Sequence, residues 1–310
     1  MIIALMALSH VTAAAPQLVD LDVLLVQVML ERAGFSPGII DGRGGANTEK
    51  ALAIYQKQGK QQQVPVPITR YRISPEDAAG PFVAIPTDMM QKAALSTLGY
   101  TSLREALAER FHSTPTFLQQ LNPDAHFVEG EEIVVPNVEA MILPVVPSKP
   151  PLNVLPLPIT PETAPARVTM PTKTDVIVTV SKSMSALTVT DTSGHIVFYA
   201  PVTTGSKHDP LPIGTWKVNG VKFNPNYHYN PHLFWNAAPR DAKATIPAGP
   251  NNPVGLVWID ISKNHYGLHG TPEPSTIGRT QSHGCVRLTN WDALRLAGLV
   301  KPGTRVVFRK

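Results

Sequence analysis

Apolar residues recur with two different periods along the chain, and the period changes about halfway. Between positions 18 and 58 they recur every three or four residues, which places them on one face of an α-helix. The first such stripe consists of Leu21, Leu24, Leu25, Val28 and Met29. This helix should end near Gly34, because glycine readily adopts the left-handed conformation found at helix C-termini. Turns at Pro37-Gly38 and Asp41-Gly42 should lead to a second helix, capped by Asn47 or Thr48.

A second helical unit is predicted between residues 100 and 137. Leu103 to Phe111 have helical spacing, and Thr114 can cap a following helix that runs to Leu121. The Asn122-Pro123 pair should stop that helix, because proline cannot continue it. A short β-branched segment at 133–135 then predicts a strand.

Residues 173–310 have a β pattern instead. Short β-branched segments, partly alternating between apolar and polar residues, are separated by turns rich in glycine and proline. The expected strands are 175–181, 187–191, 195–204, 216–221, 257–261 and 305–309. One helix is expected at Asn290–Ala297, with Asn290 as its cap. The predicted fold is a mainly β domain, β-sandwich or barrel-like, preceded by small helical and α+β modules.

The segment between the two halves is rich in proline. Residues 144–172 contain nine prolines, which fix φ and remove backbone donors, so they predict an extended spacer that separates the two halves. The N-terminus has a short apolar run that ends in Ala13-Ala14-Ala15, as in a secretory signal peptide, although a basic start is missing. That run is too short to cross a bilayer, and we expect no integral membrane segment.

Composition narrows the function. The net charge of +4 is scattered along the chain, without a basic stripe interleaved with aromatic residues, which argues against nucleic-acid binding. A mild positive balance suits an anionic polymer such as a cell wall. The single cysteine excludes an intramolecular disulfide and raises the question of a catalytic role.

That cysteine lies in the segment YGLHGTPEPSTIGRTQSHGCVRL, residues 266–288. A thiol with a pKa of about 8.5 is mostly protonated at neutral pH and needs a positive partner to become a thiolate. His269 and His283 are the candidate bases, and an imidazole that draws off the proton would make Cys285 reactive below the pH range of a free thiol. Gly284 permits a tight turn that can aim backbone N–H groups at an oxyanion.

A zinc site is an alternative for the same segment. Its ligands would be His265, His269, His283 and Cys285. Two histidines four residues apart need a helix to align their rings, and Gly267 and Gly270 argue against a helix there. We therefore expect no metal and no other cofactor.

The spacing of these residues resembles the catalytic motif of the L,D-transpeptidase (YkuD) family, in which a histidine is followed after about 16 residues by Ser/Thr-His-Gly-Cys. The flanking segments PLPIGTW (210–216), IPAGPNNPVG (246–255) and YGLHGTPEP (266–274) also look like this family. The resemblance covers essentially all of residues 173–310. It implies a cysteine acyltransferase that attacks a peptidoglycan stem peptide, releases the terminal D-alanine and passes the acyl group from a thioester to an amine.

The resemblance also implies roles for individual residues. Cys285 would be the nucleophile and His269 the general base, with the carbonyl group of Gly270 orienting its ring. Ser282, His283 and Gly284 would shape the oxyanion loop. Arg287 would support that loop or a substrate carboxylate.

Two further resemblances concern the first half of the chain. Residues 16–62 resemble a small helical peptidoglycan-binding module, and 98–138 resemble a LysM-type module that binds glycan strands. The predicted organisation is a signal peptide at 1–15, these two modules, a proline-rich linker at 139–172 and a catalytic domain at 173–310. The expected partners are stem peptides and glycan strands, in the periplasm or cell envelope. The acceptor stays open between a diamino-acid side chain, a lipoprotein lysine and water. Water would make the protein an L,D-carboxypeptidase or an amidohydrolase on the same substrate, and a non-catalytic wall-binding protein is a further alternative.

Overall fold

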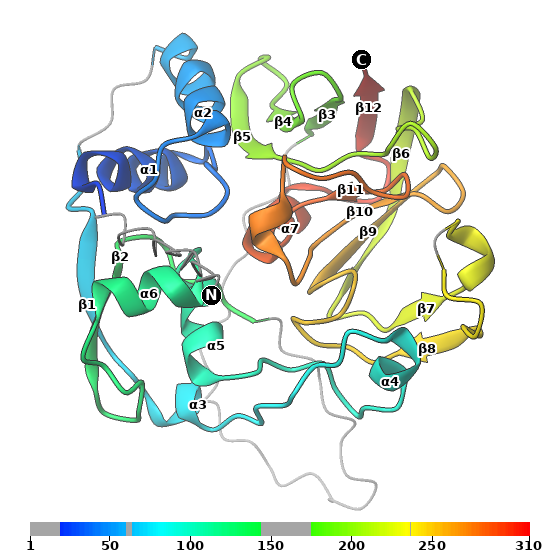
Figure 1. Cartoon of the computed structure of the whole chain (residues 1–310). Helices are drawn as coiled ribbons and strands as arrows, with labels where there is room; N and C mark the ends of the chain where they lie inside the picture. Colours follow the sequence, from blue (N-terminus) through cyan, green and yellow to red (C-terminus); the bar gives the residue numbers. More distant parts are fainter. Residues whose placement is uncertain (1–18, 60–63, 144–174, 236) are drawn as a thin grey trace, which may run out of the picture.

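The computed structural model describes residues 19–59, 64–143, 175–235 and 237–310. Helical units from the first half of the chain lie beside one large sheet formed by the second half (Figure 1). The expected signal peptide at 1–15 and most of the expected linker lie outside the described residues. Within the described ranges, no helix combines the length and the apolar character needed to cross a membrane.

The first unit consists of two helices, as the apolar stripe predicts. Helix α1 spans Leu21–Ala33 and ends at Gly34, whose φ of 88° is left-handed. Helix α2 spans Ala46–Lys57, but its N-cap is Gly45, and no side chain caps it. The expectation of a cap at Asn47 or Thr48 is therefore wrong, because both residues already lie inside the first turn.

The second unit is a two-stranded sheet with helices between its strands. Strand β1 (Ile68–Arg72) pairs antiparallel with β2 (Glu132–Pro136). Between them lie α3 (Pro75–Ala78), α5 (Leu103–Arg110) and α6 (Pro115–Leu121), the last capped by Thr114 as expected. Strand β1 begins 30 residues before the predicted start at 98 and was not foreseen.

A long excursion interrupts this second unit. After α3 the chain crosses to the sheet domain, where α4 (Met89–Ala93) packs beside β8 (Ala244–Ile246). The apolar residues Leu98, Tyr229 and Ile246 form a buried cluster there. The segment from 79 to 101 therefore attaches the second unit to the β7–β8 hairpin, whose other strand is Tyr227–Tyr229 (Figure 1).

The C-terminal domain is built on one eight-stranded sheet in the order β11-β10-β9-β6-β12-β3-β4-β5. Its strands are β3 (Ile177–Ser181), β4 (Ala186–Thr190), β5 (Ile196–Pro201), β6 (Gly214–Phe223), β9 (Val257–Ile261), β10 (Gly267–His269), β11 (Val286–Arg287) and β12 (Arg305–Arg309). Two short 3₁₀ turns, η1 (Pro231–Leu233) and η2 (Pro274–Thr276), lie in its loops. The long strand β6 pairs with β12 through its first half and with β9 through its second, with a register shift between Val218 and Gly220. The mainly β prediction is confirmed.

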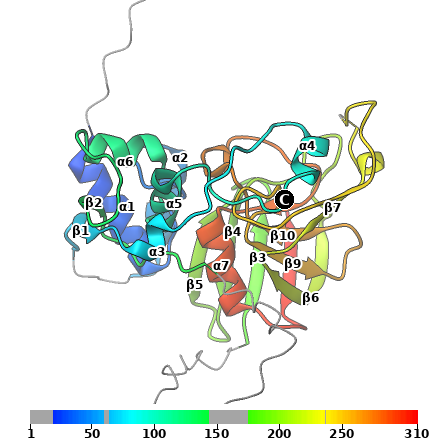
Figure 2. The ribbon, with the colours of Figure 1, turned by 90° about the horizontal axis from the view of Figure 1, so that it is seen from below.

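Helix α7 (Asn290–Leu299) packs on β9 and β10, on the side of the sheet that faces the N-terminal helices (Figure 2). Thr289 is its N-cap, so the expected cap at Asn290 is displaced by one residue. The capping hydroxyl of Thr289 accepts from the N–H of Asp292, which leaves the Asn290 side chain available for other contacts.

The two halves of the chain are in direct contact. The Glu31 carboxylate lies 3.7 Å from the Arg295 guanidinium, and Ser36 donates to Asp292 over 3.0 Å. Phe35 forms a bridge with Tyr199 in β5 and shares a hydrophobic cluster with it. The expectation that the spacer holds the halves apart is therefore wrong, because buried polar and apolar contacts join them.

Candidate active site

The candidate nucleophile and base lie on two neighbouring strands. Strands β10 and β11 are parallel, with Leu268 opposite Val286 and His269 opposite Arg287. Side chains alternate between the faces of a sheet, so Cys285, one residue before β11, shares a face with Arg287 and with His269. The structure thus brings together the two residues that the sequence separates by 16 positions.

The ring of His269 is fixed from two sides. It is 4% exposed, its Nδ1 lies 2.7 Å from the carbonyl oxygen of Gly270, and it stacks on Trp258 with ring centres 5.5 Å apart. A carbonyl oxygen can only accept, so Nδ1 carries the proton and Nε2 is the basic nitrogen. Burial, aided by the positive charge of Arg287 and opposed by the Gly270 bond, lowers the pKa of His269 to about 3. The ring is therefore neutral at physiological pH and can accept a proton.

The thiol of Cys285 is partly buried on the same face of the sheet. Its S–H group points to the carbonyl oxygen of His265 at 3.7 Å. Burial raises the pKa of Cys285 above its ordinary value of 9.0, although the Gly267 N–H and the charge of Arg287 oppose that rise. The resting site thus holds a neutral thiol and a neutral imidazole. Both shifts run against the expectation of a thiol that ionises below the range of a free one, because burial penalises both charged forms.

The turn before the nucleophile needs a glycine. Gly284 has a φ of 112°, and a Cβ at this position would lie 2.7 Å from the ring of Tyr266. The Oγ of Ser282 accepts from the Gly284 N–H at 3.2 Å and donates to the Cys285 carbonyl oxygen at 2.6 Å. Ser282 and Gly284 therefore define the shape of the loop that carries the thiol.

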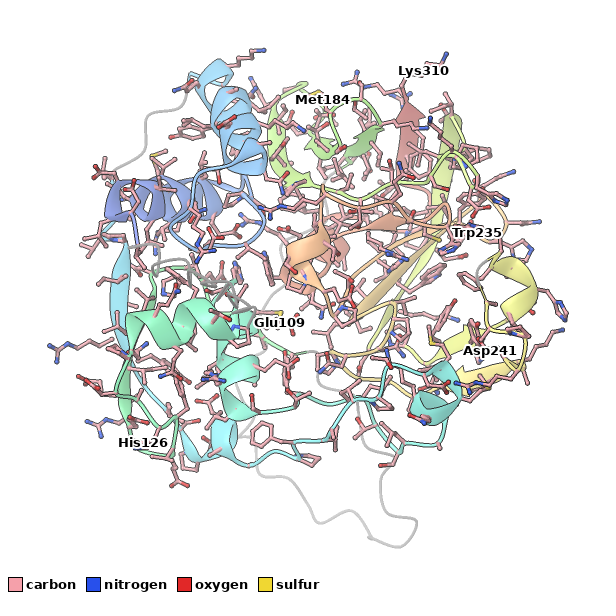
Figure 3. The ribbon with its side chains drawn as sticks, in the orientation of Figure 1. Glu109, His126, Met184, Trp235, Asp241 and Lys310 are labelled. Atoms are coloured by element: carbon pink, nitrogen blue, oxygen red, sulfur yellow. The ribbon has the colours of Figure 1, made fainter. Side chains whose placement is uncertain are left out.

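His283 faces a different environment. Its ring lies 5.0 Å from that of Phe234 and 5.8 Å from that of Trp235, both beside η1. Burial and the charge of Arg287 lower its pKa. His283 thus braces the loop against the segment that Figure 3 marks at Trp235.

Arg287 is the charge common to the site. It acts electrostatically on His269, His283 and Cys285, in each case lowering the pKa. Tyr227 and Tyr266 lie close enough for the charge of Cys285 to act on them, since burial first and that charge second raise the pKa of both hydroxyls.

Asn290 supports the peptide next to His269 from behind, a role that sequence reasoning missed. Its Oδ1 accepts from the Leu256 N–H at 3.0 Å, and a Cβ on Gly270 would lie only 2.1 Å from this oxygen. Its Nδ2 donates over 2.8 Å to Glu109 of α5. Asn290 therefore packs against the peptide unit that holds His269. Its position at the start of a helix suggested only a cap.

The four residues of the zinc alternative do not come together as a set. His265 is exposed, with only its carbonyl group facing Cys285, and residues 267–269 form a strand rather than a helix. Throughout the parts of the chain described, no group of three or more His, Cys, Asp and Glu side chains could hold a metal ion.

Two segments of the chain match models of known protein families. Residues 175–308 match the YkuD family, described as the L,D-transpeptidase catalytic domain, and residues 20–63 match a putative peptidoglycan-binding domain. Residues 175–308 thus form a domain of the YkuD family, and residues 20–63 are similar to a putative peptidoglycan-binding domain.

Individual relatives match over shorter stretches. A putative L,D-transpeptidase YkuD of Bacillus licheniformis is 53% identical over 57 residues, 18% of this chain and 34% of that protein. A probable L,D-transpeptidase YbiS of Escherichia coli is 39% identical over 115 residues, 36% of this chain and 37% of that protein. The chain thus spans about a third of the length of these relatives. Among solved structures, L,D-transpeptidase 3 from Mycobacterium tuberculosis matches with a TM-score of 0.37 and 18% identity, over 44% of this chain and 60% of that one.

Proposed function

We propose that the protein is an L,D-transpeptidase that acts on peptidoglycan stem peptides through a thioester on Cys285. The observation that carries this proposal is the common face of β10 and β11, which holds both a fixed, neutral imidazole and the only thiol of the chain. The match of residues 175–308 to the catalytic domain supplies the reaction class.

Because the thiol of Cys285 and the imidazole of His269 are both neutral at rest, proton transfer accompanies the attack on the substrate. As Sγ attacks the carbonyl carbon of a stem peptide, Nε2 of His269 takes the thiol proton, so both charges develop in the transition state. The tetrahedral oxyanion then collapses and expels the terminal D-alanine, whose amine receives the proton from His269. An amine from a second stem attacks the resulting thioester, which regenerates the thiol and forms the new amide.

The remaining residues would have supporting roles. The Gly270 carbonyl group stabilises the imidazolium through Nδ1, as the third group of a triad does. Ser282, His283 and Gly284 hold the loop that receives the oxyanion. Arg287 offers a guanidinium to a substrate carboxylate.

The test is mass spectrometry of the intact protein and of its products with a purified disaccharide tetrapeptide. An adduct of the tripeptide acyl group on wild type, absent from Cys285→Ala, would support the proposal. Cross-linked dimers identify an amine acceptor, whereas tripeptide alone identifies water and a carboxypeptidase. Adding a peptide with a C-terminal lysine tests a lipoprotein-type acceptor. Dimers formed by Cys285→Ala would refute the mechanism.

We also propose the division of the chain into a signal peptide at 1–15, wall-binding modules at 16–62 and 98–138, a linker at 139–172 and a catalytic domain at 173–310. Export to the cell envelope follows from a wall substrate. The N-terminal sequence of the protein recovered from an envelope fraction tests the export, and a start before residue 10 would contradict cleavage near Ala15.

A further inference from the structure

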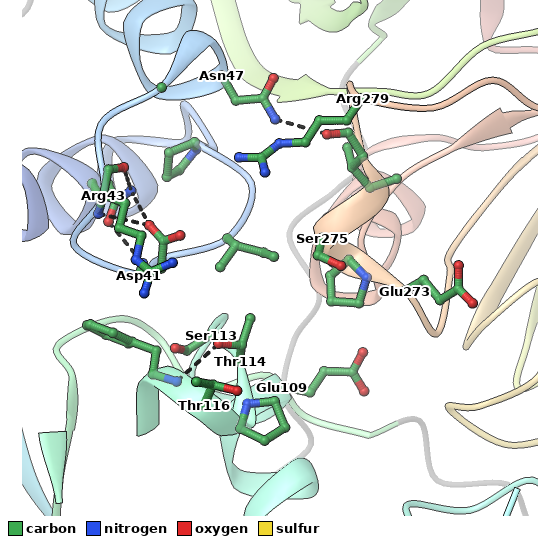
Figure 4. Close-up of a pocket in the computed structure, with 18 of the residues that line it drawn as sticks. Asp41, Arg43, Asn47, Glu109, Ser113, Thr114, Thr116, Glu273, Ser275 and Arg279 are labelled. Carbon is green, nitrogen blue, oxygen red and sulfur yellow. Dashed lines mark hydrogen bonds between the residues drawn. The ribbon is translucent and has the colours of Figure 1, made fainter. Parts of the chain in front are cut away.

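A cleft of about 810 Å³ lies where three parts of the chain meet, away from Cys285. Its walls are the loop 37–48 from the first unit, the residues 101–120 from the second, and the loop 272–279 that follows β10 (Figure 4). This volume lies in the range of small-molecule sites, about 300–1,000 Å³.

Hydrogen bonds join the first wall to each of the other two, and the second wall to the catalytic domain. The Asn47 side chain donates to the Ile277 carbonyl oxygen at 3.1 Å, and the Ser113 hydroxyl donates to the carbonyl oxygen of Ile40 at 2.9 Å. Asn251 of the catalytic domain donates to Glu105 at 3.0 Å. The cleft is therefore a built feature with fixed walls.

Most carboxylates around the cleft are already engaged. Asp41 accepts from Gln27 at 3.1 Å and from a backbone N–H at 3.0 Å. Glu105 accepts from Asn251, and Glu109 from Tyr100 and Asn290. The fourth, Glu273, points away from the centre of the cleft in Figure 4.

Arg104 donates to Gln119, but the other two arginines of the lining are available. Within the described ranges, the guanidinium groups of Arg43 and Arg279, on opposite walls, make no hydrogen bond or ion pair. The N-terminus of the 12-residue helix α2 adds uncapped N–H groups, since residues 45–48 line the cleft and no side chain caps the helix. The cleft thus presents one unbonded guanidinium from each of two modules, to which a ligand carboxylate can bond, beside carboxylates that are mostly hydrogen-bonded to the protein.

Neutral polar groups complete the lining. Hydroxyl and amide side chains are contributed by Ser102, Thr114, Thr116, Gln120 and Ser275. Such groups bond to sugar hydroxyls and peptide amides, whereas guanidinium groups bind carboxylates in a bidentate manner.

We propose that this cleft is a second peptidoglycan site, which binds a sugar-linked stem peptide through its free carboxylates while Cys285 acts on another stem. The inference rests on the proposed function for the source of the ligand, and the loop 37–48 belongs to the segment that matches a peptidoglycan-binding domain. Arg43 and Arg279 receive the carboxylates.

The experiment measures binding of a disaccharide tetrapeptide to the full chain carrying Cys285→Ala, which prevents turnover. Arg43→Gln and Arg279→Gln are added singly and together. Arg305→Gln is the matched control, because it removes the same charge from an exposed residue of β12 outside the cleft. Titration calorimetry gives both affinity and stoichiometry.

We expect two molecules bound per chain, with each arginine substitution weakening one of the two sites about tenfold, as expected for losing a charged hydrogen bond. A ligand whose stem carboxylates are amidated cannot bond to the arginines in this way. Its affinity for the Arg305→Gln control should therefore equal the affinity of the free-acid ligand for the Arg43→Gln, Arg279→Gln double variant. Equal affinities of the double variant and Arg305→Gln, or one site that ignores both arginines, would overturn the proposal.

Acyl-enzyme formation on the wild-type chain is scored in parallel. If Cys285 is acylated but the arginine variants bind like the control, the second site is refuted and the proposed function stands. If the arginine variants lose binding but no acyl-enzyme forms, the site stands and the proposed function fails.

Discussion

The protonation state of the resting site yields a sharp prediction about thiol reactivity. The perturbation is pH, with His269→Gln as the comparison variant. If the pKa of Cys285 lies above 9.0, the thiolate fraction at pH 7 is at most about 1 in 100, and it rises about tenfold per pH unit. An imidazole with a pKa of about 3 contributes no inflection between pH 5 and 9.

The assay is the pseudo-first-order rate of iodoacetamide alkylation from pH 5 to 10, read by mass spectrometry. Labelling is unambiguous, because Cys285 is the only cysteine. Wild type and His269→Gln should give rising curves of the same shape without a plateau below pH 9. Acylation by a stem peptide should nevertheless fall by about 10²–10⁴-fold in His269→Gln, since the general base is lost.

One result would refute this reasoning. A plateau of wild-type alkylation below pH 7 that disappears in His269→Gln would mean that the two side chains form a thiolate–imidazolium pair at rest. The base would then act before the substrate arrives rather than during the attack.

Other predictions follow from the groups around the base and at the contact between the halves. Gly270→Ala should abolish acylation, because its Cβ would lie 2.1 Å from Asn290 Oδ1 and displace the carbonyl group that orients the base; wild-type turnover in this variant would contradict that role. Glu109→Gln should flatten the pH dependence of unfolding. Burial raises the pKa of Glu109 from 4.5 to about 7, so the wild type binds more protons when folded and loses stability as pH rises through that window, by about 3 kcal/mol at most. Denaturant unfolding of both proteins at pH 4.5 and 7.5 measures the difference. Asp292→Asn should be neutral or stabilising at pH 7, because burial and the charge of Glu31 raise the pKa of the Asp292 carboxyl well above 3.8. Glu31→Gln should instead lower the free energy of unfolding by about 1.5–3 kcal/mol, because it weakens charged hydrogen bonds. Thermal unfolding that shows Asp292→Asn to be the less stable variant would refute these charge states.

Local sequence patterns predict the helices and helix ends that depend on neighbouring residues alone. The stripe that begins at Leu21 and the glycine at 34 give α1 and its end, and Thr114 gives the start of α6. The pairing of His269 with Cys285 was also predictable, because a short motif in one segment carries both residues.

The sequence did not reveal features that depend on distant partners. Strand β1 is stable because it pairs with β2, more than 60 residues away. Asn290 looks like a cap until Glu109 and the Gly270 backbone are placed around it. The contact between Ser36 and Asp292 joins residues 256 positions apart, and no periodicity signals such a bond.

The contact between the halves also constrains the order in which the molecule can assemble. Arg295 donates to the carbonyl oxygen of Glu31 across 264 residues, so the loop that this bond closes contains most of the chain. Closing so long a loop carries an entropic cost that only late, cooperative contacts can offset. Helix α7 contributes both this contact and Asn290, which supports the Gly270 peptide. A chain synthesised from its N-terminus therefore cannot place the support behind the Gly270 peptide until α7 has been made and has packed against α1.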